Sequence, residues 1–265
     1  MPWGEGFVGI SLVLPERSAL TGSAPLGPEQ VLNRYVRGIL AGCESFGVPA
    51  FYPGRDLVTV EGRMLGMASF DTEPSGALVV EAVLAVGRDF TELPRLLDRA
   101  DPGGVVRAAM VTAEETTCLA ARIGRTPDLT EMADRLRQGY EQRLGVRFAE
   151  RIQRVEIGFD EDGWLGQRRG RPGLERRATV VGQLGALEVY SALEAGRIHE
   201  VMLAGDVIAN SAAIERLEDE LRGCPAERVA IEAVVKRVLA LPGNFLLGLG
   251  TPASAAASIA AEMVP

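Results

Sequence analysis

The feature that most constrains the fold is a pair of short apolar runs joined by two residues. Leu57–Val60 and Arg63–Phe70 have the composition of strands, and Glu61-Gly62 stands between them. A two-residue connection with glycine in second place is typical of a β-hairpin, because glycine readily adopts the positive φ that such a turn needs. The sequence therefore predicts an antiparallel pair at this point of the chain.

Strands and helices are also expected on both sides of this hairpin. Apolar runs of strand length occupy residues 7–14 and 77–86, and the first of them is stopped by a proline. Helical spacing of apolar residues predicts a helix that opens at Pro28 and ends at Gly47, a short helix over 90–97, and a helix over 128–144. Asp128 and Glu131 form a capping-box-like start for the last of these.

The pattern changes in the second half of the chain. Residues 163–177 are rich in arginine and glycine, which favours a linker. Three strand-like runs and two amphipathic helices follow, and this order indicates a small α+β module with helices on one face of a sheet. The predicted strands are 178–183, 186–193 and 198–204, and the predicted helices contain Ile214, Leu217 and Leu221, and Val229, Val234, Val235 and Val238. The predicted fold class is α/β (α+β), with domains at 1–150 and 178–265 and a linker at 151–177.

Composition restricts the function. The net charge of −8 disfavours a protein that covers nucleic acid phosphates. No apolar run approaches the roughly 20 residues of a membrane span, and the first residues lack a basic segment followed by an apolar one. Three widely spaced cysteines argue against both a disulfide framework and a zinc site, so no metal centre is expected. These features are typical of a cytoplasmic protein that binds neither membrane nor nucleic acid.

Two segments together resemble the lipoate–protein ligase A family of the biotin and lipoate ligase superfamily. The stretch 54–69, Gly-Arg-Asp-Leu-Val-Thr-Val-Glu-Gly-Arg-Met-Leu-Gly-Met-Ala-Ser, is similar to the hairpin of that family. The stretch 186–225, with Leu-Glu-Val-Tyr190, Gly-Arg-Ile-His199, Leu-Ala-Gly-Asp206 and Leu-Arg-Gly-Cys-Pro225, resembles its C-terminal accessory domain. The order of elements between the two segments also fits, so the resemblance covers nearly the whole chain.

The resemblance implies a fold and a chemistry. It implies a partial ligase-type catalytic domain with a mixed sheet, followed by a small α+β accessory domain. In that family ATP activates lipoate to an acyl-adenylate, and the acyl group then passes to a lysine of a carrier domain. ATP and lipoate are therefore expected as substrates, with Mg²⁺ as a further candidate and a lipoyl carrier domain as the partner.

The sequence departs from the family at the catalytic lysine, whose position here is Met64. Methionine carries no charge, so it cannot stabilise the negative charge that develops during acyl transfer. The single lysine of the chain is Lys236, in the accessory module. Arg63 adjoins Met64, but successive side chains of a strand point to opposite faces, so Arg63 is expected to point away. No catalytic residue is therefore assigned.

The second departure lies at the N-terminus, where the family's Arg-Arg-x-x-Gly-Gly-Gly segment has no counterpart. This favours a chain that is truncated, that works with an N-terminal partner subunit, or that has lost the catalytic half. Little turnover by the chain alone is expected. The alternative function is a non-catalytic accessory or regulatory subunit of a split ligase.

The resemblance also marks candidate binding residues, each with a structural alternative. Asp56 would contact adenylate or Mg²⁺, or bond only to nearby backbone. Gly66 would give close approach within the sheet, and Met64 with Met67 would fill a pocket that once needed a cation. The substrate or adenylate-binding set implied by the resemblance is Asp56, Arg63, Met64, Gly66, Gly76 and Ala77. His199, Asp206 and the arginines of 168–177 are interpreted as surface, turn and linker residues, with phosphate or acidic-partner binding as the alternative for the arginines.

Overall fold

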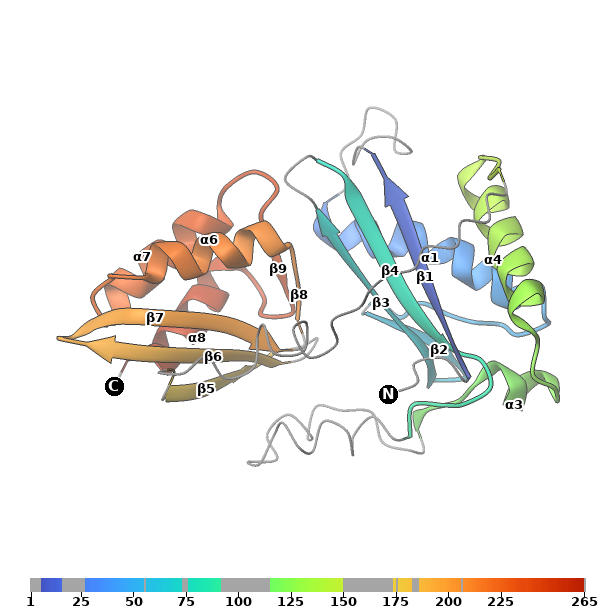
Figure 1. Cartoon of the computed structure of the whole chain (residues 1–265), viewed down its shortest axis with the longest axis horizontal. Coiled ribbons are helices and arrows are strands. Elements are labelled where there is room, and N and C mark those ends of the chain that lie inside the picture. Colours follow the sequence, from blue (N-terminus) through green and yellow to red (C-terminus); the bar gives the residue numbers. More distant parts are fainter. Residues whose placement is uncertain are drawn as a thin grey trace, which may run out of the picture. The chain divides into compact units, whose positions relative to one another are not determined.

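The computed structural model divides the chain into two compact units, Met1–Phe148 and Ala149–Pro265 (Figure 1). Each unit is described by itself. The residues that the structure describes are 6–15, 27–54, 56–72, 76–91, 115–149, 174, 176–182, 186–205 and 207–264, without the side chains of residues 29 and 177. The partition predicted from the sequence, with a linker at 151–177, stays a prediction, because most of that segment lies outside the described residues.

The first unit contains a four-stranded sheet in the order β1-β4-β3-β2. All of its strand pairings are antiparallel. Its strands are β1 (Phe7–Leu14), β2 (Leu57–Val60), β3 (Arg63–Thr72) and β4 (Leu78–Ala85). The expected α/β class is confirmed, while the parallel component of the expected mixed sheet is represented among the described residues by one bridge, between Met64 and Thr116.

The hairpin between β2 and β3 forms where the sequence predicts it. Val60 pairs with Arg63, and the two residues between them have positive φ, 52° at Glu61 and 78° at Gly62. A turn with both central residues in this region matches the twist of the flanking strands. Glutamate adopts this conformation less readily than glycine, so the strand pairing must hold it there.

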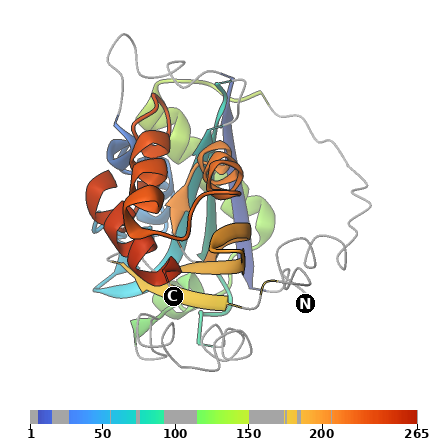
Figure 2. The same cartoon turned by 90° about the vertical axis from the view of Figure 1, so that its left-hand side faces the viewer.

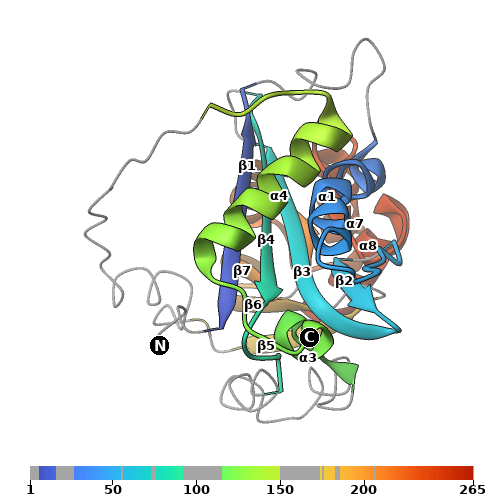
Figure 3. The same ribbon diagram turned by 90° about the vertical axis from the view of Figure 1, so that its right-hand side faces the viewer.

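Two helices cover one face of this sheet. Figure 3 shows α1 (Pro28–Glu44) beside α4 (Leu129–Leu144), both in front of the strands. The helices approach closely because glycines face each other: a Cβ on Gly139 would lie 2.3 Å from the carbonyl oxygen of Gly38. The buried ring of Tyr140 covers Gly38 in the same contact.

The start of α4 shows half of the predicted capping box. The Asp128 carboxylate accepts a hydrogen bond from the Glu131 amide at 2.8 Å, which satisfies one exposed donor of the first turn. The Glu131 carboxylate instead accepts hydrogen bonds from both terminal nitrogens of Arg125, at 2.6 and 2.7 Å. This guanidinium holds the pKa of Glu131 below its ordinary value.

The sheet has one buried face and one exposed face. Leu12, Val80 and Phe70 form a cross-strand row that is buried on the helix side. The neighbouring row, Ser11, Glu81 and Ser69, is exposed on the other side. Because side chains alternate along a strand, the odd-numbered residues of β4 share this second face, which we call the open face.

In the second unit, helices pack on one face of a three-stranded antiparallel sheet, β5-β6-β7. Figure 2 shows this unit facing the viewer. Its strands are β5 (Arg176–Val181), β6 (Ala186–Glu194) and β7 (Arg197–Gly205), with the short pair β8 (Ile208–Ala209) and β9 (Leu246–Leu247). Its helices are α6 (Ser211–Leu221), α7 (Arg228–Leu239) and α8 (Pro252–Met263). One apolar core joins these elements.

Two helices were not expected from the sequence. One is α3 (Leu119–Ile123), a helix of five residues that precedes α4. The other is α8, whose start carries a usable signal: the Thr251 hydroxyl accepts from the Ser254 amide, and Pro252 occupies the first turn. The predicted helix 90–97 lies mostly outside the described residues, as does the arginine-rich stretch 163–177.

Candidate functional site

A β-bulge shapes the strand that carries Met64. β2 pairs Val58 with Gly66 and Thr59 with Met64, so Leu65 has no partner opposite it. An extra residue of this kind shifts the alternation of side chains by one position. Met64 and Met67, which a regular strand would place on opposite faces, therefore pack in the same apolar cluster.

This cluster lies at the hairpin end of the open face, and we call it the open-face cluster. Val83 and Ala85 of β4 belong to it, which fixes the face, and Met64 is only 2% exposed within it. The partly buried members leave apolar side-chain surface accessible. The cluster consists of Met64, Ala85 and Phe90, which are buried, and Phe7, Leu57, Met67, Val83 and Cys118, which are partly buried.

The segment 115–118 continues the sheet beside Met64, past the end of β4. The Thr117 amide donates to the Met64 carbonyl at 2.9 Å, and the Thr116 hydroxyl lies 3.4 Å from the same oxygen. The Thr116 hydroxyl oxygen also accepts from the Phe90 amide at 3.0 Å. One buried hydroxyl thus fixes both the strand and the aromatic residue of the open-face cluster.

Two aromatic rings close the cluster. The centroids of Phe7 and Phe90 are 5.1 Å apart and their planes are tilted by 47°. Such tilted pairs are favoured over face-to-face stacking by the charge distribution of the rings. The rings, the two methionines and the aliphatic side chains make a surface that suits a hydrocarbon chain rather than a charged group.

The cations near the hairpin lie at its turn. Arg63 is exposed, in contrast to buried Met64 beside it. Arg122 of α3 donates to the Glu61 carboxylate at 2.7 Å and to the Thr117 hydroxyl at 3.2 Å. Its Nη2 atom is buried with no hydrogen-bond partner among the described residues. Arg122 therefore links the hairpin turn to the segment 115–118.

Asp56 lies at the start of the hairpin, and its carbonyl accepts from the Ala68 amide at 2.7 Å. Its carboxylate is close enough to Tyr52 to affect that phenol. Burial first, and the Asp56 charge second, raise the pKa of Tyr52 to about 12. Tyr52 is therefore neutral at physiological pH and keeps its proton for donation.

Of the other predicted residues, Gly66 lies two positions from Met64 on β3, whereas Gly76 and Ala77 lie at a distance from both. A Cβ on Gly66 would meet the Leu84 side chain at 2.5 Å and the Val83 carbonyl at 2.8 Å, so Gly66 permits close approach of β3 and β4. Gly76, with φ of 88°, and Ala77 precede the opposite end of β4. Gly66 pairs with Leu84, so at the usual rise per residue Gly76 and Ala77 lie roughly 25 Å from the Gly66 level of the sheet. The structure thus groups Asp56, Arg63, Met64 and Gly66, and separates Gly76 and Ala77 from them.

Sequence reasoning missed four residues that complete this part of the sheet: Phe90, Thr116, Thr117 and Arg122. They lie far from the hairpin in sequence and belong to no short motif. A buried threonine pair before a helix carries no signal of a partner strand 52 residues earlier. Elsewhere, His199 is mostly exposed beside Glu194, and Asp206 lies outside the described residues.

Two searches of the described residues gave negative results. They contain no group of three or more His, Cys, Asp or Glu side chains placed to hold a metal ion. No helix in the described part of the chain is long and apolar enough to cross a bilayer.

Comparison with known proteins gives one sequence match. Residues 174–245 match the family model of the bacterial lipoate protein ligase C-terminus. No curated protein matches the chain in sequence.

Among solved structures, the chain is similar to Plasmodium falciparum LipL1 in complex with lipoate, with a TM-score of 0.62, 11% identity, and coverage of 97% of this chain and 72% of LipL1. A bipartite lipoate protein ligase from Thermoplasma acidophilum gives a TM-score of 0.43 at 15% identity, over 56% of this chain and 55% of that one. Biotin protein ligase from Aquifex aeolicus gives 0.35 at 12%, over 76% and 82%.

The LipL1 likeness extends over both units, and the family match falls within the second unit. The chain therefore has a fold similar to that of LipL1, and residues 174–245 of its second unit are similar to the bacterial lipoate protein ligase C-terminus.

Proposed function

We propose that this chain is a lipoate–protein ligase-like protein that works on a lipoyl or related acyl group, carried as its adenylate, and on a lysine of a carrier domain. The observation that carries the proposal is the fold likeness to LipL1, whose structure contains lipoate, over 97% of this chain. The open-face cluster adds a physical reason. A surface of methionine, aromatic and aliphatic side chains suits the hydrocarbon part of an acyl chain.

The same cluster argues for little turnover by the chain alone. Acyl transfer develops negative charge, and an ammonium group at position 64 would stabilise it. Met64 instead contributes an uncharged, buried side chain. The cations described near the hairpin do not belong to the open-face cluster, because Arg63 is exposed and Arg122 is engaged by Glu61 and Thr117.

The binding residues remain part of this proposal. Met64 and Met67 would contact the acyl chain on the open face. Asp56, with Tyr52 beside it, would bind the adenylate or its Mg²⁺, and Arg63 would approach a phosphate from the turn. Gly66 acts through sheet packing, and Gly76 with Ala77 would border the ligand only at the far end of β4.

The cosubstrates and partners follow from the same proposal. ATP and lipoate would be the substrates, and the acyl acceptor would be a lipoyl carrier domain. A second polypeptide that supplies a catalytic segment is proposed as a partner. The described cysteines Cys43, Cys118 and Cys224 are free thiols, which accords with a proposed cytoplasmic location.

An alternative function is a non-catalytic accessory or regulatory subunit that keeps the binding scaffold. The specific observation in its favour is that Met64 is integrated in a packed cluster rather than placed at its edge. Both functions require acyl binding, and they differ in whether the chain contributes to turnover.

Binding can be tested through Cys118, a partly buried member of the open-face cluster. We expect lipoate to slow alkylation of Cys118 by iodoacetamide, whereas Cys224 of the second unit, also partly buried, serves as the reference thiol. The readout is mass spectrometry of tryptic peptides with and without lipoate. If lipoate protects neither thiol, or protects both equally, binding at the open-face cluster is contradicted.

Turnover can be tested with lipoate, ATP and an apo-carrier domain. The chain alone is expected to give little or no lipoylation, and Met64→Lys to raise the rate, with Met64→Leu as the size-matched control. Robust lipoylation by the unaltered chain would refute the role assigned to position 64. Activity only after addition of a second polypeptide would favour the accessory function.

A further inference from the structure

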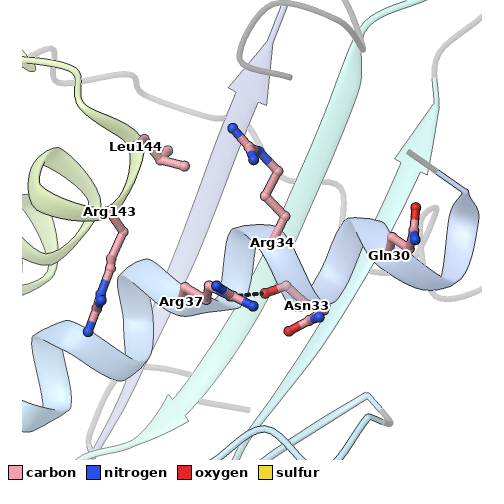
Figure 4. Close-up of a pocket in the computed structure, with 6 residues that line it drawn as sticks. All are labelled: Gln30, Asn33, Arg34, Arg37, Arg143 and Leu144. Carbon is pink, nitrogen blue, oxygen red and sulfur yellow. Dashed lines mark hydrogen bonds between the residues drawn. The ribbon is translucent and has the colours of Figure 1, made fainter. Parts of the chain in front are cut away.

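A basic pocket lies on the helix side of the first unit, away from the open-face cluster. It has a volume of about 280 Å³. Its lining comes from α1 and from the C-terminal end of α4, as Figure 4 shows. The residues that line it are Gln30, Asn33, Arg34, Arg37, Arg143 and Leu144.

Three of these six residues are arginines, and no acidic side chain of the described residues lines the pocket. This local excess of positive charge stands out in a chain whose net charge is −8. Like charges that share a small volume repel one another, so the arrangement is stabilised when an anion enters.

The guanidinium groups of Arg37 and Arg143 keep donors available for such an anion. The described contact of Arg37 is a hydrogen bond from Nε to the Asn33 carbonyl at 3.2 Å. This contact does not use the two terminal amino groups of Arg37, which can donate to an anion. Arg143 reaches from α4 to within 3.7 Å of the Glu44 carboxylate, beyond ordinary hydrogen-bond distance. Both arginines are well exposed and can adjust to a ligand.

The remaining lining residues fit a polar, compact ligand. The Gln30 side-chain oxygen already accepts from the Gly27 amide at 3.1 Å, so its amino group is the part that can donate to a ligand. Asn33 adds a second amide, and Leu144 forms an apolar wall (Figure 4). The volume is at the lower end of the range for small-molecule sites.

We propose that this pocket binds a phosphate group, either as free phosphate or pyrophosphate or as part of a small phosphate ester. Arginine is suited to this chemistry because its planar, permanently charged group donates two parallel hydrogen bonds to adjacent phosphate oxygens. The site lies on the opposite side of the sheet from the open-face cluster, so the proposal does not rest on acyl binding.

The test is calorimetric titration of the full chain with pyrophosphate, inorganic phosphate and AMP at low ionic strength. We expect saturable binding that Arg37→Gln weakens by about tenfold or more, because a doubly anionic group loses a charge-assisted pair. Arg137→Gln on α4 is the matched control: it removes the same charge from a helix that lines the pocket, but Arg137 pairs with Asp134 and does not line the pocket itself. It should change the affinity less than about twofold.

The outcomes separate clearly. Tighter binding of AMP than of phosphate would identify a phosphate ester as the ligand. Tighter binding of pyrophosphate than of phosphate would identify a free polyphosphate. Either result supports the site. Absence of saturable binding to all three probes would overturn the proposal. So would equal weakening by Arg137→Gln, or equally tight binding of acetate, since these indicate a general effect of charge. Circular dichroism of each variant confirms that the helices are intact.

Discussion

The hydroxyl of Thr116 lies 3.4 Å from the carbonyl oxygen of Met64, a residue 52 positions earlier in the chain. The Thr116 hydroxyl oxygen also accepts a hydrogen bond from the Phe90 amide at 3.0 Å. Three segments that are distant in sequence therefore meet at one buried hydroxyl, and the open-face cluster is assembled around it.

Replacing this hydroxyl should lower stability. Thr116→Val preserves the shape of the side chain but leaves the buried Phe90 amide without its partner. An unsatisfied buried donor costs about 1–3 kcal/mol, so we expect the free energy of unfolding to fall by that amount. Urea denaturation, followed by far-UV circular dichroism, measures this free energy of unfolding.

The control for this variant is Thr130→Val, at an exposed position of α4. Threonine and valine have similar helix propensities, so its effect should stay within about 0.5 kcal/mol. Equal effects of the two variants would show that the Thr116 hydroxyl contributes nothing specific.

Met64→Lys should place an amine in an apolar cluster. Burial disfavours the charged form, so the pKa of this lysine should fall below its ordinary value of about 10.4. The unfolded chain then binds more protons than the folded one at pH values between the two pKa values. The variant should therefore become more stable as pH rises towards about 10, relative to Met64→Leu.

The measurement is the unfolding midpoint of both variants over a pH series. A constant difference between Met64→Lys and Met64→Leu across the series would mean that the lysine amino group reaches solvent. In that case the open-face cluster would not exclude a charged amine at position 64.

Gly139→Ala should separate α1 from α4. Its new Cβ would lie 2.3 Å from the Gly38 carbonyl oxygen and 2.7 Å from the Gly42 nitrogen, and backbone atoms on both sides cannot rotate away. Overpacking of this kind costs about 1–3 kcal/mol. Gly9→Ala is the control, because nothing lies within 4 Å of its new Cβ. Thermal unfolding of both variants decides the comparison.

Cys43 should be the least reactive of the described thiols. It is buried in α1, and burial raises the pKa of its thiol to about 12. The thiolate is the reactive form, so alkylation at pH 8 should proceed far more slowly at Cys43 than at partly buried Cys118. Rapid labelling of Cys43 under native conditions, read by mass spectrometry, would indicate that α1 opens locally.

Local sequence signals predicted the elements that local chemistry decides. Glu61-Gly62 specified the hairpin turn, and Pro28 and Asp128 marked the starts of α1 and α4. The helix α8 was missed although Thr251 and Pro252 offered a start signal, because its small residues give weak amphipathic contrast.

The arrangement around Met64 was beyond such signals. The bulge at Leu65 depends on the register of β2 against β3, and nothing in the local pattern marks the extra residue. The partnership of Met64 with Thr116 is a tertiary contact between segments of ordinary composition. For Arg63, strand alternation predicted only that its side chain points away from that of Met64.

The contact between Met64 and Thr116 also sets an order of folding events. A two-residue hairpin closes within microseconds, whereas a contact that spans 52 residues must first overcome the entropy of closing a long loop. The β2–β3 hairpin can thus precede the arrival of Thr116, and the open-face cluster is completed late. Interactions formed after the rate-limiting step act mainly on the unfolding rate. The lifetime of the intact open-face cluster is therefore expected to depend on the Thr116 hydroxyl.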